Sequence, residues 1–152
     1  MPDHEHWMKI ALEQARIAGE TGNRAVGAVI VHDDQIVAIG SNRRESAFDP
    51  LGHAETTAML DRVARSGTLD FTACTLYTTL EPCPMCCGAI AVNNIQTIVV
   101  GSMHPRGNRR WGDYTVNKVT EMIGQGAEIV EGILEDECNA VLKEFDANLG
   151  RT

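Results

Sequence analysis

The chain has 152 residues, 43% of them hydrophobic and 22% charged, which fits one globular domain spanning residues 1–152. No apolar run approaches the roughly 20 residues that a membrane span needs, and the polar start Met1–His6 does not resemble a secretory signal, so we expect a cytoplasmic protein. The formal net charge of -8 works against binding a polyanion and favours a small-molecule substrate.

Hydrophobic periodicity predicts alternating helices and strands. Apolar residues at helical spacing predict a helix from His6 to about Glu20. Two β-branched runs, Ala25–Val31 and Gln35–Ile39, are joined by a short polar link and predict an antiparallel hairpin. After a polar loop, we expect a helix over 53–65, a strand over 74–80, a helix over 84–93, a strand over 96–100, an irregular loop over 101–112, a helix over 115–123, a strand over 127–130 and a helix over 136–148. This order predicts an α/β fold with one mixed sheet and helices on both faces.

The strongest chemical signal lies in the cysteines. Five cysteines in a chain without an export signal are better interpreted as thiols or metal ligands than as a disulfide framework. Cys83 and Cys86 stand three residues apart near a predicted helix start, so both sulfurs can reach one ion, and the helix start favours their thiolates. By itself the pair could instead be a redox motif or part of the core. The other three, Cys74, Cys87 and Cys138, are expected to pack as small apolar side chains.

His53-Ala54-Glu55 changes the balance between these alternatives. As ligands, His53, Cys83 and Cys86 would leave the fourth tetrahedral position of a zinc ion for water, the open geometry of a catalytic site. Residues two apart do not share a helix face, so the ion must lie beyond the amino end of the helix, with Glu55 directed at the water as the proton carrier. The pattern therefore predicts one Zn²⁺ per chain and hydrolytic loss of ammonia from an amidine-like ring carbon.

The combination of His-x-Glu with Pro-Cys-x-x-Cys is the signature of zinc nucleobase deaminases. With Ala25–Val29, Asn42, Thr75–Cys83 and Glu131–Leu134, the chain resembles the cytidine-deaminase-like superfamily over most of its length, especially bacterial tRNA adenosine deaminases and fungal-type cytosine deaminases. The resemblance implies a three-layer α/β/α sandwich around a mixed central sheet, usually assembled as a homodimer. It also implies that Asn42 hydrogen-bonds the substrate ring and that the Ala54 backbone helps to recognise the ring's edge. A turn residue after a strand is the other interpretation of Asn42.

Two segments depart from these families. The end of the chain, residues 145–152, has no equivalent of the aromatic and acidic segment that closes the pocket of fungal-type cytosine deaminases, and residues 103–114 lack the Gly/Ala-rich character usual in the tRNA enzymes. In the second segment Trp111 or Tyr114 could stack on a planar base, and an arginine could meet a carbonyl or a phosphate. The alternative is an ordinary surface loop with Trp111 packed inward. The arginines concerned are Arg106, Arg109 and Arg110.

Three functional hypotheses follow. The first is deamination of a free nucleobase or small nucleoside, which the acidic net charge favours. Cytosine or a related ring is the first compound to try, and guanine is another. The second is adenosine-to-inosine deamination of tRNA, suggested by the extended resemblance and the arginine cluster. The third is a non-catalytic zinc module in which the metal only holds the fold.

Overall fold

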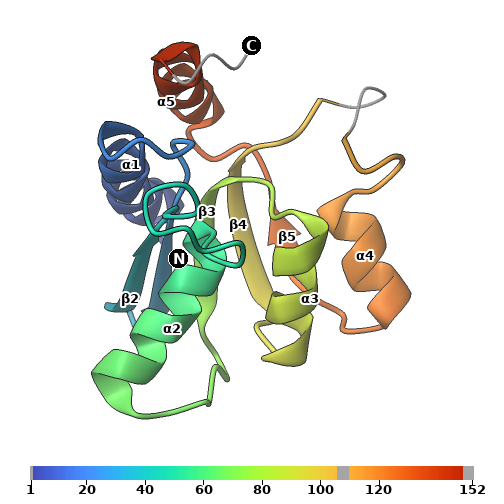
Figure 1. The fold of residues 1–152 in the computed structure, drawn as a ribbon. Coiled ribbons are helices and arrows are strands. Elements are labelled where there is room, and N and C mark those ends of the chain that lie inside the picture. The colour runs from blue at the N-terminus through green and yellow to red at the C-terminus, as the bar shows by residue number, and fades with distance from the viewer. Residues whose placement is uncertain (1, 106–109, 149–152) are drawn as a thin grey trace.

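The computed structural model describes residues 2–105 and 110–148 (Figure 1). The predicted helices and strands are all present, with ends shifted by a few residues. In chain order they are α1 (His4–Glu20), β1 (Gly27–His32), β2 (Gln35–Ser41), α2 (Ala54–Ser66), β3 (Thr75–Leu80), α3 (Pro84–Val92), β4 (Thr97–Ser102), α4 (Val116–Ile123), β5 (Glu128–Val130) and α5 (Glu135–Asn148).

The predicted hairpin is formed by β1 and β2, which pair antiparallel with His32 opposite Gln35. Asp33 and Asp34 make the two-residue turn, and both have left-handed backbone angles, with φ of 50° and 59°. Short hairpins favour such turns because their twist matches that of the strands, and Asp tolerates this conformation better than most residues.

The sheet is mixed, as the order of elements predicted. Its strand order is β2-β1-β3-β4-β5, in which β1 runs antiparallel to both β2 and β3 whereas β3, β4 and β5 are parallel. Parallel neighbours need crossover connections, and α3 and α4 supply them between β3 and β4 and between β4 and β5. The carboxyl ends of β3 and β4 therefore lie at one end of the sheet, together with the start of α3.

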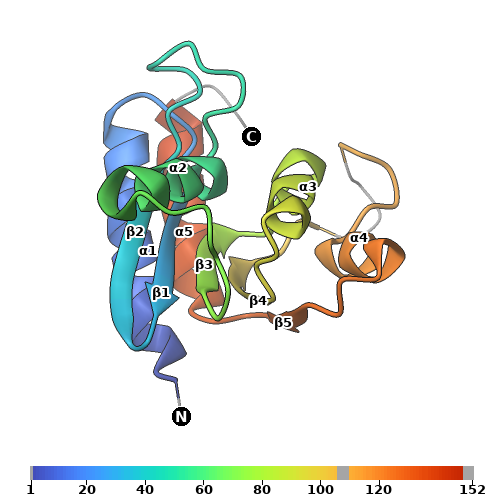
Figure 2. The ribbon, with the colours of Figure 1, turned by 90° about the horizontal axis from the view of Figure 1, so that it is seen from below.

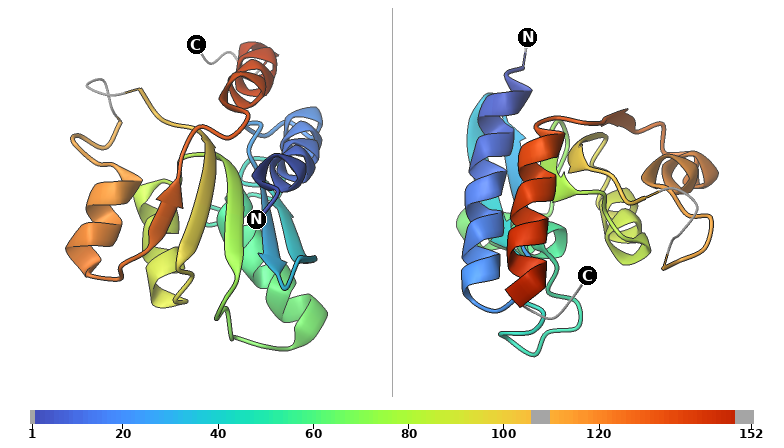
Figure 3. Two further views of the ribbon diagram at one scale, coloured as in Figure 1. Left: turned by 180° about the vertical axis from the view of Figure 1, so that it is seen from behind. Right: turned by 90° about the horizontal axis from the view of Figure 1, so that it is seen from above.

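Two layers of helices cover the sheet. Helices α1 and α5 lie side by side on one face, and α2, α3 and α4 lie on the other (Figures 2 and 3). Successive side chains of a strand point to opposite faces, so Ala28 and Ile30 of β1 pack in the core with α2, whereas Val29 and Val31 pack with α1. The result is the expected three-layer α/β/α sandwich.

Helix α2 packs closely on the hairpin, so that its first turn lies against β2. A Cβ atom at Gly40 of β2 would overlap the backbone of Ala54 and Ala58 in α2, so the contact requires glycine at this position. Across the described ranges, none of the helices has the length and apolar character needed to traverse a bilayer.

Candidate active site

The starts of α2 and α3 converge, and each supplies a metal-binding side chain from its N-cap. His53 precedes α2 and Cys83 precedes α3, both with extended backbone angles (φ -75°, ψ 167° and φ -70°, ψ 171°). Neither side chain makes a capping hydrogen bond to its own helix. Pro84 occupies the first turn of α3, where the missing N–H costs nothing. Both side chains are therefore available beyond the helix ends, where the sequence predicted an ion.

The spacing of the three predicted ligands fits zinc. His53 Nδ1 lies 3.4 Å from Cys83 Sγ and 3.6 Å from Cys86 Sγ, and the three ligand atoms all lie within 4.8 Å of one another. A tetrahedral zinc ion with Zn–S of about 2.3 Å and Zn–N of about 2.0 Å separates nitrogen from sulfur by about 3.5 Å. Both cysteines are free thiols. The donor set and the spacing of its three atoms thus suit one Zn²⁺.

Hydrogen bonding among the ligands prepares a thiolate. The pKa of Cys83 falls to about 4, mainly because the Cys86 thiol donates a hydrogen bond to it, with a further contribution from His53. The same interactions raise the pKa of His53 and of Cys86, because each holds a proton against the Cys83 thiolate. Since a metal binds the thiolate rather than the thiol, one ligand is already in its binding form at neutral pH.

Glu55 lies in the first turn of α2 and is 3% exposed. Burial raises the pKa of its carboxyl group above the ordinary value, and the polar contact with Cys86 offsets part of this rise. The Thr78 hydroxyl of β3 lies 3.1 Å from Glu55 Oε1 and 2.9 Å from the carbonyl oxygen of Leu80. A hydroxyl has one proton to donate and can also accept. Thr78 can therefore donate to the Glu55 carboxylate, or accept from the protonated acid while donating to Leu80.

A cavity of about 550 Å³ opens over the ligands, within the usual range for small-molecule sites. Among its described lining residues are His53, Ala54, Glu55 and Cys83. Its wall and rim also carry charged side chains that sequence reasoning did not single out as site residues, namely Arg24, Arg44, Glu45, Glu81 and Asp146. These come from segments far apart in the chain, so no local pattern indicated them. Two ion pairs link them: Arg44 to Glu45 at 2.7 Å and Arg24 to Asp146 at 3.4 Å.

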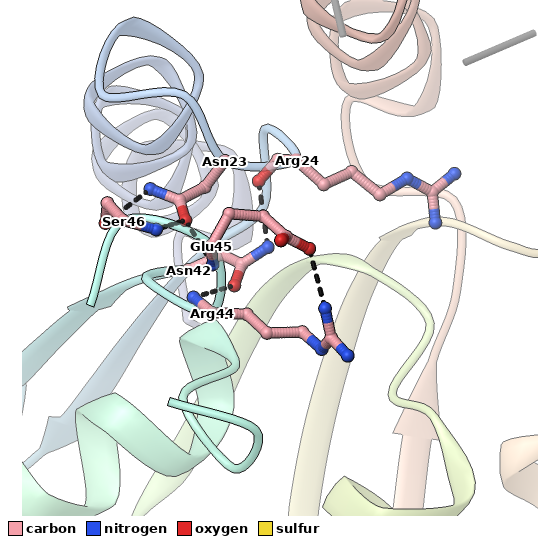
Figure 4. A network of polar contacts seen from close by, with 6 residues as sticks. All are labelled: Asn23, Arg24, Asn42, Arg44, Glu45 and Ser46. Carbon is pink, nitrogen blue, oxygen red and sulfur yellow. Dashed lines mark hydrogen bonds and ion pairs between the residues drawn. The ribbon is translucent and has the colours of Figure 1, made fainter. Parts of the chain in front are cut away.

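Asn42 lines the cavity and also organises its rim (Figure 4). Its Nδ2 donates to the Arg24 carbonyl oxygen and its Oδ1 accepts from the Arg44 amide, both at 3.1 Å. The buried Asn23 assists, since its Oδ1 accepts from the Glu45 amide at 2.9 Å. Asn42 therefore acts as a turn residue, and after its bonds to the described residues its amide group still has one proton and one lone pair for a ligand.

The aromatic residues predicted to stack on a base have different surroundings. Trp111 is 37% exposed and lines the cavity, with the Arg110 guanidinium 5.5 Å from its ring centroid. Tyr114 is buried, touches Trp111 edge-on at 5.9 Å between ring centroids, and its hydroxyl lies 3.8 Å from Cys87 Sγ. Among the described residues that line the cavity, Tyr114 is absent. Arg106 and Arg109, also named from the sequence, lie outside the described residues.

Comparison with known protein families supports the zinc-binding signature that was recognised in the sequence. Residues 1–102 match the family profile of the cytidine and deoxycytidylate deaminase zinc-binding region. A tRNA-specific adenosine deaminase of Bacillus subtilis is 36% identical over 145 residues, covering 95% of this chain and 89% of the relative.

Two of the similar solved structures act on different substrates. One comes from work on A-to-I editing by tRNA:A34 deaminases at the wobble position, with a TM-score of 0.79 and 29% identity over 90% of this chain and 98% of that one. The other is guanine deaminase from Bacillus subtilis, with a TM-score of 0.63 and 36% identity over 68% of this chain and 66% of that one.

Proposed function

The chain belongs to the family of the cytidine and deoxycytidylate deaminase zinc-binding region, and from that membership we propose that it hydrolyses adenosine to inosine in tRNA, releasing ammonia. The observation that carries the proposal is the similarity to tRNA-specific adenosine deaminases along nearly the whole chain. The action of residues 1–152 as one deaminase domain is part of the same proposal.

The cavity supports this substrate. Its volume of about 550 Å³ has room for a nucleoside extruded from its strand. Arg24, Arg44 and Arg110 stand at its wall and rim, where guanidinium groups can meet the phosphates that flank the nucleoside. The net charge of -8 led us to expect a small substrate, yet phosphates respond to the local charges at a binding surface. The expectation that cytosine or a related free base comes first is not confirmed by the comparisons.

The residues divide the chemistry between them. Zinc held by His53, Cys83 and Cys86 would supply an activated water for attack on the ring carbon that carries the amino group. Glu55 takes a proton from the water and delivers it to the adjacent ring nitrogen. It then takes the proton of the hydroxyl group added to the ring carbon and delivers it to the amino group, which leaves as ammonia while the carbonyl forms. Asn42 would hydrogen-bond the ring, and the backbone N–H of Ala54, at the start of α2, has no partner within its own helix and suits an acceptor on the ring's edge.

The test is inosine formation in a transcribed tRNA that carries adenosine at the wobble position. Inosine is detected as guanosine after reverse transcription, and the same tRNA with guanosine at that position gives the signal of complete conversion. Glu55→Ala should retain zinc and tRNA binding but form no inosine. Binding of tRNA should weaken steeply with added salt as counterions are released. Absence of both binding at low salt and inosine would reject the proposal, and zinc-loaded protein inactive on every substrate would favour the non-catalytic module.

Deamination of guanine or a related free aminopurine is the second candidate. It is favoured by the similarity to guanine deaminase and by Asp146, which lines the cavity. Within the described part of the chain, Asp146 Oδ1 is buried without a hydrogen-bond partner. A carboxylate oxygen in that position suits a ring that offers N–H donors. Ammonia release from guanine, with no inosine in tRNA, would select this candidate, and Asp146→Asn should then reduce the turnover of guanine.

A homodimer and a cytoplasmic location complete the proposal. Leu60 of α2 and Val92 of α3, on one face of the sheet, are 60% and 85% exposed, and Phe48 and Leu51 in the preceding loop are 93% and 63% exposed. Where such side chains form one contiguous apolar patch, they favour contact with another protein surface. Light scattering that gives the mass of one chain at micromolar concentration would reject the dimer.

A further inference from the structure

Glu81 is a buried carboxylate that the proposed chemistry does not use. It follows β3, immediately before the Pro82-Cys83 turn, and is 2% exposed although it lines the cavity. A buried charged group is costly unless it is hydrogen-bonded. Glu81 Oε1 accepts a hydrogen bond from the His104 amide at 3.1 Å, and Oε2 accepts one from the Val116 amide at 2.9 Å. Both carboxylate oxygens are thus bonded to backbone.

These two partners lie on either side of Trp111 in the chain, and we call the described residues 104–105 and 110–116 the mouth segment. His104 follows β4, and Val116 is the first residue of α4, where an amide has no partner within its helix and a negative charge is favoured. The Glu81 amide also donates to the Ser102 carbonyl oxygen at 2.7 Å. One residue beside the metal-binding turn therefore holds both ends of the mouth segment.

The mouth segment contributes Trp111 to the cavity wall. Its ring makes edge-on contacts with His104, at 5.6 Å between centroids, and with Tyr114, at 5.9 Å. His104 is itself one of the anchored residues, and Tyr114 lies two residues before the other, Val116. Movement of either anchor would therefore move the aromatic wall relative to the metal ligands.

We propose that Glu81 is a positioning residue that holds the mouth segment so that Trp111 forms one wall of the substrate site, and that it determines substrate affinity rather than the chemical step. The part concerning affinity rests on the proposed deaminase function. The part concerning the position of the mouth segment does not, so the two are tested separately.

The structural test uses Glu81→Gln, which keeps the shape of the side chain but replaces one acceptor oxygen by an amino group. One of the two backbone hydrogen bonds is then lost. In a Trp7→Phe background, where Trp111 is the remaining tryptophan, quenching of its emission by acrylamide should increase. Amide exchange at His104 or Val116 should accelerate about tenfold, the equivalent of one lost charge-assisted bond. Zinc content should not change.

Asp61→Asn is the matched control for the structural test. Asp61 Oδ2 accepts a hydrogen bond from the Ile39 amide at 2.9 Å, well away from the mouth segment in the fold. This variant should leave the exchange at His104 and Val116 and the quenching of Trp111 unchanged. Exchange and quenching in Glu81→Gln equal to those of the parent protein would overturn the proposal, as would an equal response in the control.

The kinetic test asks whether Glu81 acts through Trp111. Glu81→Gln should raise KM about tenfold and leave kcat within about twofold, and Trp111→Ala should raise KM to a similar extent. In the double variant the two effects should not add, because the second change removes the group that the first one positions. Additive effects, or a fall in kcat at unchanged KM, would contradict the proposal. If the parent protein deaminates no substrate, the proposed function fails, and the exchange and quenching measurements still decide the role of Glu81.

Discussion

Thr78 offers a specific test of how Glu55 carries protons. Its hydroxyl lies 3.1 Å from Glu55 Oε1, and the residue has no exposed surface. Thr78→Val keeps the volume and the β-branch while it removes the hydroxyl group. Glu55 then loses a hydrogen-bond partner, and a bond to a charged group contributes about 1.5–3 kcal/mol. If that contribution is made mainly in the transition state, kcat should fall roughly ten- to hundredfold.

The assay measures ammonia release, or inosine in tRNA, at saturating substrate for Thr78→Val and Thr78→Ser. The serine variant restores the hydroxyl and should recover most of kcat, while zinc content and the unfolding midpoint remain close to those of the parent protein. Full activity in Thr78→Val would refute the reasoning. Equal losses in both variants would also refute it, because they would assign the effect to packing rather than to the hydroxyl.

Three further predictions concern the metal centre and the sheet edge. Removal of zinc by a chelator should lower the thermal midpoint by about 5–10 °C, because saturation at about 100 times Kd contributes about 2.7 kcal/mol; an unchanged midpoint after verified metal loss would contradict this. In metal-free protein at pH 6, iodoacetamide should label Cys83 before Cys87 or Cys138, because the pKa of Cys83 is lowered to about 4 while burial raises the pKa of the other two to about 12. Labelling of Cys83 should decline only as the pH falls through about 4, and mass spectrometry that finds uniform labelling would count against the ligand network. Asp61→Ala removes the acceptor of the Ile39 amide on the edge strand β2 and should cost about 1 kcal/mol in urea unfolding; no measurable loss would mean that water replaces the carboxylate.

Substrate preference shows where reasoning from the sequence was weakest. The net charge of -8 favoured a small molecule, whereas the relatives favour tRNA adenosine deamination. A net charge sums over the whole surface, but a nucleic acid meets only the residues around the cavity. There Arg24 and Arg44 stand beside Glu45 and Asp146, and the balance of these four charges depends on how the chain folds.

The sequence alone determined the helices and strands and the three metal ligands, because both follow from local rules. Periodic apolar residues indicate an element within one segment, and His53, Cys83 and Cys86 belong to two short motifs at helix starts. The side chains that contact Glu55 and Glu81 could be identified only from the tertiary structure. Thr78 meets Glu55 across 23 positions, and Glu81 meets Val116 across 35. Such contacts leave no local pattern, since they exist only once β3 lies in the sheet between β1 and β4 and the crossover helices return to its face.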